Sequence, residues 1–433
     1  MKAFRGEILS VPDDPAAAGA DGIRHFGDGL LVVEEGLVLA CGAHADLADR
    51  FADVPVERLD GLIVPGFVDA HVHYPQIECI ASHGEQLMQW LERHIFPAEK
   101  AFADRAHADS VAAFFLDELL RHGTTSALVF ATVHAGSVDA LFEAALTRDM
   151  RIVSGKVLMD LGPEGLRDTV ASGRADTEAL IARWRGRGRL GYAVTPRFVP
   201  TSSVEQLADA GALVAAHRDV LMHTHLSENP GEIDFVASRF PEAADYLDVY
   251  DRFGLVGPRS VFAHCVHMGD RALARMAEAG AGIAFCPTSN MFLGSGLFNL
   301  AQADSHGLGL GIGTDVGAGT TLSMLHTLGE AYRTCQLKGA SLDPFRALHL
   351  ATAGGARIMG IADRVGGLLP GQEADFVVLD SAATPLLARR CAGASLHDRL
   401  FALQILGDDR SIAATYLRGR LAHRRGVELG GTA

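Results

Sequence analysis

The sequence lacks the apolar segments that would place a protein in or across a membrane. It has no run of about eighteen apolar residues, the length that a spanning helix needs. Its first residues, MKAFRGEILSVPDD, carry no apolar signal core and become acidic early. We therefore expect neither a membrane protein nor a secreted one, and we predict a cytoplasmic location.

Positive charge is also scarce. The chain has 38 lysines and arginines against 53 aspartates and glutamates, which gives a formal net charge of -15. Binding a phosphate backbone needs a basic surface, so nucleic acid is not an expected partner. A short arginine-rich run, residues 183–189, is typical of a solvated helix end. A small neutral or cationic substrate fits this composition better.

Several motifs that would indicate other chemistry are missing. None of the six cysteines forms a CxxC pair, which argues against a thiolate zinc site or a redox dithiol and predicts reduced thiols. No GxGxxG or GxxxxGK[ST] loop occurs, so a phosphate cradle is not indicated. His83-Gly84-Glu85 matches the HxE half of a signature that pairs HxE with PCxxC around a zinc ion, but the required PCxxC is absent.

What the sequence does contain is a regular alternation of helical and strand-like segments. Residues 110–123 have the pattern of an amphipathic helix before an apolar strand at 124–130, and residues 203–219 precede 220–225 in the same way. About eight apolar runs lie between residues 62 and 315, which predicts a parallel α/β sheet closed into a (β/α)8 barrel of the TIM type. A doubly wound open sheet is the alternative.

The two ends of the chain differ from this middle part. Both carry short alternating runs joined by turns, such as LLVVEEGLVLACG near the start and GGLLPGQEADFVVLD near the end. We predict that residues 1–62 and 366–433 form one small β-sandwich domain. Residues 63–365 would form the metal-dependent barrel.

His71 and His73 lie in the string PGFVDAHVH at the end of the first predicted barrel strand. Alternate residues of a strand point to the same side, so both imidazoles leave one face together. Neutral imidazoles at this spacing suit zinc or iron. The carboxyl ends of barrel strands are also where active sites of this fold form.

His225 ends the strand VLMHTH, and Glu228 follows three residues later. This spacing lets the histidine bind a metal ion while the carboxylate reaches a substrate from the next loop. His223 lies two residues earlier and shares the same face, so it is a rival ligand. A helix N-terminal position is the structural alternative for Glu228.

His264 and Asp315 end two further strands, SVFAHC and LGIGTD. Each has an ordinary structural explanation, a core histidine and a helix N-cap. Four strand ends with metal-binding residue types are nevertheless best explained by one barrel mouth that brings them together. The residues thus predict a hydrolase that activates water on one divalent ion, zinc or iron.

The strings that carry these residues resemble the amidohydrolase superfamily and, within it, the guanine deaminases. The superfamily resemblance covers nearly the whole chain and includes PGFVDAHVH, the later HLSE, AHC and GTD, and the closing LLPGQEADFVVLD. The narrower resemblance rests on HVHYPQ, QWLERHIFPAE, VTPRFVPTS, HLSEN, FCPTSNMFLGSGLF and GTDVGAGTTLSML.

The resemblance implies roles for individual residues. The metal ligands it implies are His71, His73, His225 and Asp315, with His264 as a further ligand or as a neighbour of the reactive water. Asp315 and Glu228 would move protons during catalysis. The purine would be held by Gln76, Arg197 and Phe198, with Trp90 in the same pocket.

The implied activity is hydrolytic deamination of guanine to xanthine and ammonia by a homodimer. An oxidised purine, a pterin or a triazine is an alternative substrate, because fold and metal site do not separate these. A non-catalytic relative acting as a scaffold is the alternative from another class, and its ligands would be expected to be lost.

Overall fold

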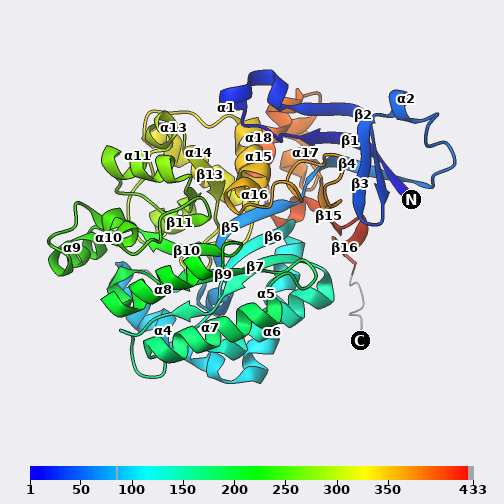
Figure 1. The fold of residues 1–433 in the computed structure, drawn as a ribbon. Helices are drawn as coiled ribbons and strands as arrows, with labels where there is room; N and C mark the ends of the chain where they lie inside the picture. Colours follow the sequence, from blue (N-terminus) through cyan, green and yellow to red (C-terminus); the bar gives the residue numbers. More distant parts are fainter. Residues whose placement is uncertain (84–85, 428–433) are drawn as a thin grey trace.

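The computed structural model describes residues 1–83 and 86–427, and it contains two separate sheets (Figure 1). One is a parallel barrel in the middle of the molecule, and the other is a mixed sheet beside it. Gly84 and Glu85 of the HxE-like triplet lie outside the described residues, as do residues 428–433.

The barrel is built from parallel strands that follow each other in chain order, with one short strand beside them. These strands are β5 (Phe67–His73), β6 (Thr124–Phe130), β7 (Arg151–Gly155), β8 (Val157–Leu158), β9 (Gly191–Pro196), β10 (Leu221–Leu226), β11 (Ser260–His264), β12 (Gly282–Phe285) and β13 (Gly309–Ile312).

The first strand meets the segment after the last strand at the carboxyl end of the barrel. The Asp315 N–H donates to the His71 carbonyl at 2.9 Å, and the His73 N–H donates to the Val316 carbonyl at 2.8 Å. These bonds close the ring at this end, so the predicted barrel is confirmed and the open sheet is excluded.

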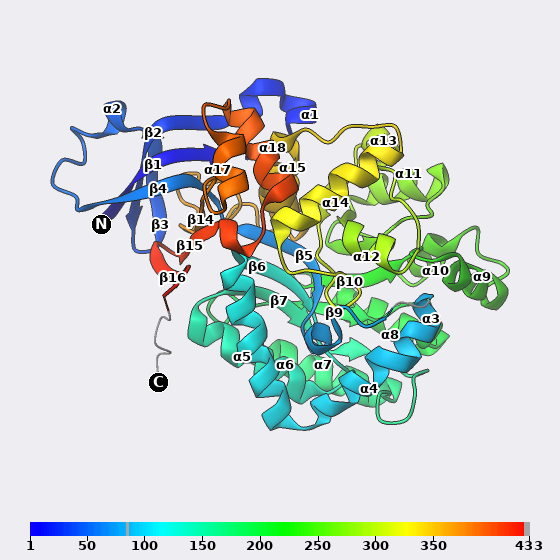
Figure 2. The same ribbon diagram turned by 180° about the vertical axis from the view of Figure 1, so that it is seen from behind.

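Helices cover the barrel and connect its strands. The helices of the described chain are α1 (Pro15–Ala18), α2 (His44–Leu47), α3 (Leu87–Trp90), α4 (Phe96–Lys100), α5 (Arg105–Arg121), α6 (Ala135–Arg148), α7 (Val170–Trp184), α8 (Val204–Ala216), α9 (Pro230–Arg239), α10 (Tyr246–Arg252), α11 (Asp270–Ala279), α12 (Pro287–Phe292), α13 (Leu300–Ser305), α14 (Met324–Leu337), α15 (Pro344–His349), α16 (Gly355–Ile358), α17 (Pro385–Cys391) and α18 (Leu396–Leu406). After the barrel the chain continues as α17 and α18, and α18 lies beside α14 (Figure 2). None of the described helices is long and apolar enough to cross a membrane.

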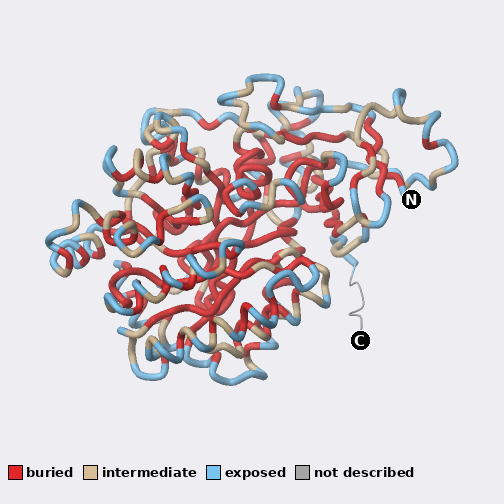
Figure 3. The backbone as a smooth tube through the Cα atoms, viewed as in Figure 1, coloured by how far each residue is buried: buried red, intermediate tan, exposed pale blue. Residues whose placement is uncertain are grey.

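Local sequence explains the alternation of helix and strand. Asp104 caps α5 by accepting from the Ala106 N–H at 2.9 Å. Gly123 has φ 83°, a conformation that glycine adopts without strain, and it turns the chain from α5 into β6. Both β5 and β6 are buried at every position, as strands of a covered parallel sheet must be (Figure 3).

The mixed sheet joins the two ends of the chain. Its order is β16 (Arg420–Arg424), β15 (Ile412–Leu417), β14 (Phe376–Leu379), β4 (Val56–Pro65), β1 (Lys2–Ser10), β2 (Arg24–Glu34) and β3 (Leu37–Ala43). The antiparallel pair of β14 and β4 joins the carboxyl-terminal strands to the amino-terminal ones. The predicted separate β unit from both ends is confirmed, while the domain boundaries at residues 62 and 366 stay a prediction.

A buried ionic cluster connects this sheet to the amino end of the barrel. Arg151 begins β7, and its Nε donates to Glu373 at 2.9 Å. Arg189 lies just before β9 and pairs with both Glu373 and Asp375, and the Arg418 N–H donates to Asp375 at 2.9 Å. Each of these carboxylates is therefore neutralised and hydrogen-bonded.

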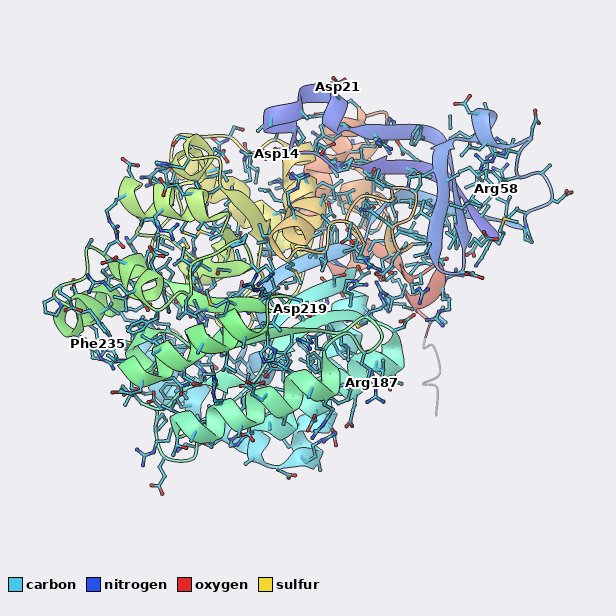
Figure 4. All side chains as sticks on the ribbon, in the orientation of Figure 1. Asp14, Asp21, Arg58, Arg187, Asp219 and Phe235 are labelled. Carbon is cyan, nitrogen blue, oxygen red and sulfur yellow. The ribbon has the colours of Figure 1, made fainter. Side chains whose placement is uncertain are left out.

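The arginine-rich run divides between surface and interior. Arg187 is exposed on the outer side of the barrel (Figure 4), as the predicted solvated helix end requires. Arg189 instead belongs to the buried ionic cluster, where it pairs with Glu373 and Asp375. All six cysteines are free, and five of them are buried, which fits the expectation of reduced thiols.

Candidate functional site

The side chains singled out in the sequence gather at the carboxyl end of the barrel. His71 and His73 lie at the carboxyl end of strand β5. His225 lies near the end of β10, and His264 is the last residue of β11. Asp315 follows β13 in the segment that closes the ring. Strands from different parts of the barrel therefore bring imidazoles and a carboxylate to one mouth, where active sites of this fold form.

Two of these residues have a backbone conformation that is uncommon outside glycine. His264 has φ 71° and Asp315 has φ 50°. Left-handed non-glycine residues cost about 1–3 kcal/mol each and persist where surrounding structure imposes them. The N–H of Asp315 is held by the His71 carbonyl, and that of Cys265, beside His264, is held by the Leu226 carbonyl. Bonds between neighbouring strands thus aim these side chains into the mouth.

The nitrogen and oxygen atoms of the group converge on one point. The His71 Nε2 lies 3.1 Å from the Asp315 Oδ1 and 3.1 Å from the His73 Nε2, which is itself 3.2 Å from the His225 Nε2. One ligand atom from each of His71, His225, His264 and Asp315 lies within 4.8 Å of the others. Imidazole and carboxylate donors so close together form a set that could hold a divalent ion.

Hydrogen bonds behind the imidazoles fix which nitrogen faces the mouth. The His225 Nδ1 lies 2.7 Å from the Arg197 carbonyl, and the His264 Nδ1 lies 2.9 Å from the Asn290 Oδ1. An oxygen that only accepts requires a proton on each Nδ1, so each Nε2 keeps a free lone pair. The buried His264 Nε2 has no hydrogen-bond partner among the described residues. This free lone pair fits a metal ligand.

His223 takes a different place from its rival His225. Its Nε2 lies 2.7 Å from the His71 Nδ1, on the side of that ring away from Asp315. Two residues of strand separate His223 from His225, roughly 6–7 Å of depth in the barrel. His223 therefore lies below the converging atoms and contacts a candidate ligand from behind.

The histidines and Asp315 at the mouth have the protonation states that bind a cation. Burial lowers the pKa of His73 to about 3 and lowers the pKa values of His71 and His225 as well. Burial alone would raise the pKa of Asp315, but the adjacent imidazoles outweigh it and hold this pKa well below its usual range. Neutral imidazoles and an ionised carboxylate are the forms that bind a metal ion.

Glu228 has the opposite protonation behaviour. Burial, together with the charge of Asp315, raises the pKa of Glu228 to about 8. Its Oε1 accepts from the Ser295 hydroxyl at 3.1 Å, and its Oε2 lies 3.6 Å from the His264 Nε2. Near neutral pH this carboxyl is protonated, so the mouth holds one proton acceptor and one proton donor.

A pocket opens beside these groups and has one apolar side. Its polar lining consists of His73, Gln76, Arg197, His225, Glu228, His264 and Asp315. Its apolar lining consists of Leu87, Trp90, Leu91, Phe198, Leu293 and Ala318. An apolar wall that faces a few polar groups suits a flat heterocycle with a polar edge.

Comparisons with known proteins show the family of this chain. Residues 62–422 match the amidohydrolase family. The chain is 49% identical to the guanine deaminase of Escherichia coli (strain K12) over 98% of both chains. It is 41% identical to a probable guanine deaminase of Deinococcus radiodurans, over 99% of this chain and 100% of the relative. The chain belongs to the guanine deaminases of the amidohydrolase family.

Solved structures of family members have the same fold as this amidohydrolase. The E. coli guanine deaminase superposes with a TM-score of 0.95 over 98% of this chain and 100% of its own. A guanine deaminase from C. acetobutylicum, solved with guanine bound in its active site, gives a TM-score of 0.90 at 28% identity over 97% and 99% of the two chains.

Motif and spacing arguments missed several residues that contact the site of this amidohydrolase. Asn290 and Ser295 contact His264 and Glu228, and both lie in the string FCPTSNMFLGSGLF. Glu99, the last letter of QWLERHIFPAE, contacts Gln76 and Arg197. Membership in these strings was the only available signal, because neither periodicity nor spacing distinguishes them from loop residues.

Proposed function

We propose that this amidohydrolase hydrolyses guanine to xanthine and ammonia, using one divalent ion held by His71, His73, His225, His264 and Asp315. One observation carries the proposal: Glu228 and the polar pair Gln76 and Arg197 line one pocket that adjoins the buried His/Asp group. Hydrolysis of guanine needs an activated water molecule, a proton donor and polar groups that bind the edge of the base. This pocket offers groups for all three.

The ion would lower the pKa of a water molecule from its bulk value to roughly 7, as it does in zinc sites. The ionised Asp315 accepts a proton from the attacking water, whose oxygen adds to C2 of the base. Glu228 donates its proton to the adjacent ring nitrogen, so the ring avoids a negative charge. Asp315 then passes its proton to the amino group, and the C2–N bond breaks so that ammonia leaves. The C2 hydroxyl returns a proton to Glu228 as the carbonyl of xanthine forms.

The remaining pocket residues bind and orient the base. Phe198 and Trp90 offer flat apolar faces, Gln76 offers a polar amide, and Arg197 can donate to a carbonyl oxygen. Zinc is the preferred ion and iron is the second candidate, since imidazole and carboxylate ligands suit both. The homodimer and the cytoplasmic location stay predictions.

Assays of the zinc-loaded protein with guanine test the proposal. We expect xanthine and ammonia in equal amounts, and we expect loss of turnover on chelation and its return with added zinc. A metal-replete protein that leaves guanine unchanged would refute the substrate assignment. A pterin, a triazine and other amino-substituted purines assayed beside guanine would then identify the alternative.

A further inference from the structure

Glu99 is a buried carboxylate that adjoins the substrate pocket. It lies on α4, is 1% exposed, and is not among the described residues that line the pocket. A charged group so deeply buried is retained only when it is paired or hydrogen-bonded. Glu99 meets this need through the two polar residues proposed to hold the base.

The first contact determines which way the Gln76 side-chain amide faces. Its Nε2 donates to the Glu99 Oε1 at 3.0 Å. A carboxylate can only accept, so the amino group of the amide must face Glu99. On the other side the Gly317 N–H donates to the Gln76 Oε1 at 3.3 Å, and this donor requires the amide oxygen. Glu99 and Gly317 thus demand the same orientation, in which the amino group also lies 3.1 Å from the His73 Nδ1.

The second contact holds the guanidinium of Arg197. Its Nη1 donates to the Glu99 Oε2 at 2.7 Å, and the guanidinium lies 5.4 Å from the ring centre of Phe96. One of its nitrogens is thus committed to Glu99. The other N–H groups stay available as donors, and a guanidinium has no acceptor to offer.

We propose that Glu99 is a positioning residue that fixes an acceptor, the Gln76 oxygen, beside a donor, the Arg197 guanidinium, and so sets the purine edge that the pocket accepts. An edge with a ring N–H next to a carbonyl, as at N1 and C6 of guanine, matches this pattern. The corresponding edge of 2,6-diaminopurine has an acceptor next to an amino donor and mismatches it. The inference rests on the proposed deaminase function.

The test uses Glu99→Gln in the zinc-loaded protein, with guanine and 2,6-diaminopurine as substrates. Because the Arg197 guanidinium only donates, the new amide turns its oxygen to Arg197 and its amino group to Gln76. Gln76 thereby loses the acceptor that set the orientation of its amide. We expect KM for guanine to rise about tenfold or more, with a smaller change in kcat, and the preference for guanine over diaminopurine to fall at least about tenfold. Bound zinc, measured by elemental analysis, should stay at the wild-type ratio.

Two companion variants sharpen the result. Glu92→Gln removes an exposed carboxylate from the same helical segment and should behave as wild type. Glu99→Asp keeps the charge near Arg197 but is one methylene shorter, so it should lose the simultaneous contact with Gln76. Glu99→Asp should lose the preference for guanine while retaining the fold. If Glu99→Gln does not fold, the substrate preference of Glu99→Asp tests the positioning role of Glu99.

The possible outcomes are distinct. Wild-type protein that fails to deaminate guanine refutes the proposed function itself. If the wild type is active, substrate preference within twofold of wild type in the Glu99 variants overturns the positioning role. An equal loss for both substrates, loss of zinc, or failure of both variants to fold also overturns it and leaves a structural role.

Discussion

The two ends of the barrel both bury polar and charged groups, but they satisfy them differently. At the amino end, Arg151 and Arg189 neutralise Glu373 and Asp375 through direct ion pairs. At the carboxyl end, three imidazole nitrogens and the Asp315 carboxylate converge, and the His264 Nε2 has no hydrogen-bond partner among the described residues.

The difference indicates that the amino end of the barrel contributes to stability and the carboxyl end to function. A buried polar group without a partner costs free energy, and a fold tolerates that cost where a ligand will supply the missing interaction. Mutations at the amino end should therefore change the free energy of unfolding and leave turnover unaffected. Mutations at the mouth should change turnover or metal binding and leave the fold intact.

The largest expected effect is that of Asp315→Asn. The amide cannot accept the proton of water as a carboxylate does, so kcat/KM for guanine should fall by about 10⁴-fold. Turnover assays measure this loss, and thermal unfolding should show an intact fold. The exposed Asp219→Asn is the matched control. Near-native turnover of Asp315→Asn would refute its role as the base.

Glu228→Gln should remove the proton donor and lower kcat/KM by about 10²- to 10⁴-fold. Because the pKa of Glu228 is raised to about 8, its acid form predominates below that pH and is lost above it. Wild-type kcat/KM should therefore decline as the pH rises through the pKa of Glu228. A pH–rate profile tests this, and an alkaline decline that persists unchanged in Glu228→Gln would contradict the assignment.

Arg189→Gln tests the amino end of the barrel. It leaves Glu373 with Arg151 alone and Asp375 without an ion-pair partner, so the free energy of unfolding should fall by about 3–5 kcal/mol. Removing the guanidinium also raises the pKa values of these carboxyls in the folded state, so the loss should be larger at about pH 8 than at about pH 5.5. Urea unfolding measures both effects.

The comparison would fail if Arg189→Gln also changed the chemistry at the mouth. Guanine turnover of the folded variant should stay within about twofold of wild type, since the substitution lies at the opposite end of the strands. The exposed Arg185→Gln is the control and should change the free energy of unfolding by no more than about 0.5 kcal/mol.

The smallest effect is expected for His223→Leu, which removes the acceptor behind the His71 Nδ1. Loss of a hydrogen bond behind a metal-binding imidazole typically costs about 10- to 100-fold in metal affinity. Competition with a chelator measures this affinity. His223→Gln restores an acceptor oxygen and should recover part of it, whereas equal affinity in wild type and His223→Leu would exclude the supporting role.

Much of the fold could be predicted from local patterns. Apolar runs and amphipathic helices repeat along residues 62–315, and each is visible in a short window of sequence. The residue types at the strand ends could be predicted for the same reason. The strand pattern by itself could not separate His225 from His223, because both lie on one face of β10 and differ in their depth in the barrel. The spacing to Glu228 and the resemblance favoured His225.

The sequence by itself determined the alternation of strand and helix, the pairing of both chain ends in a second sheet, and the chemistry available at the barrel mouth. The tertiary structure decided which groups support that chemistry. Glu99 meets Arg197 across 98 residues, and Ser295 meets Glu228 across 67. Such contacts depend on how distant loops approach each other when the barrel closes, and no local pattern encodes that approach.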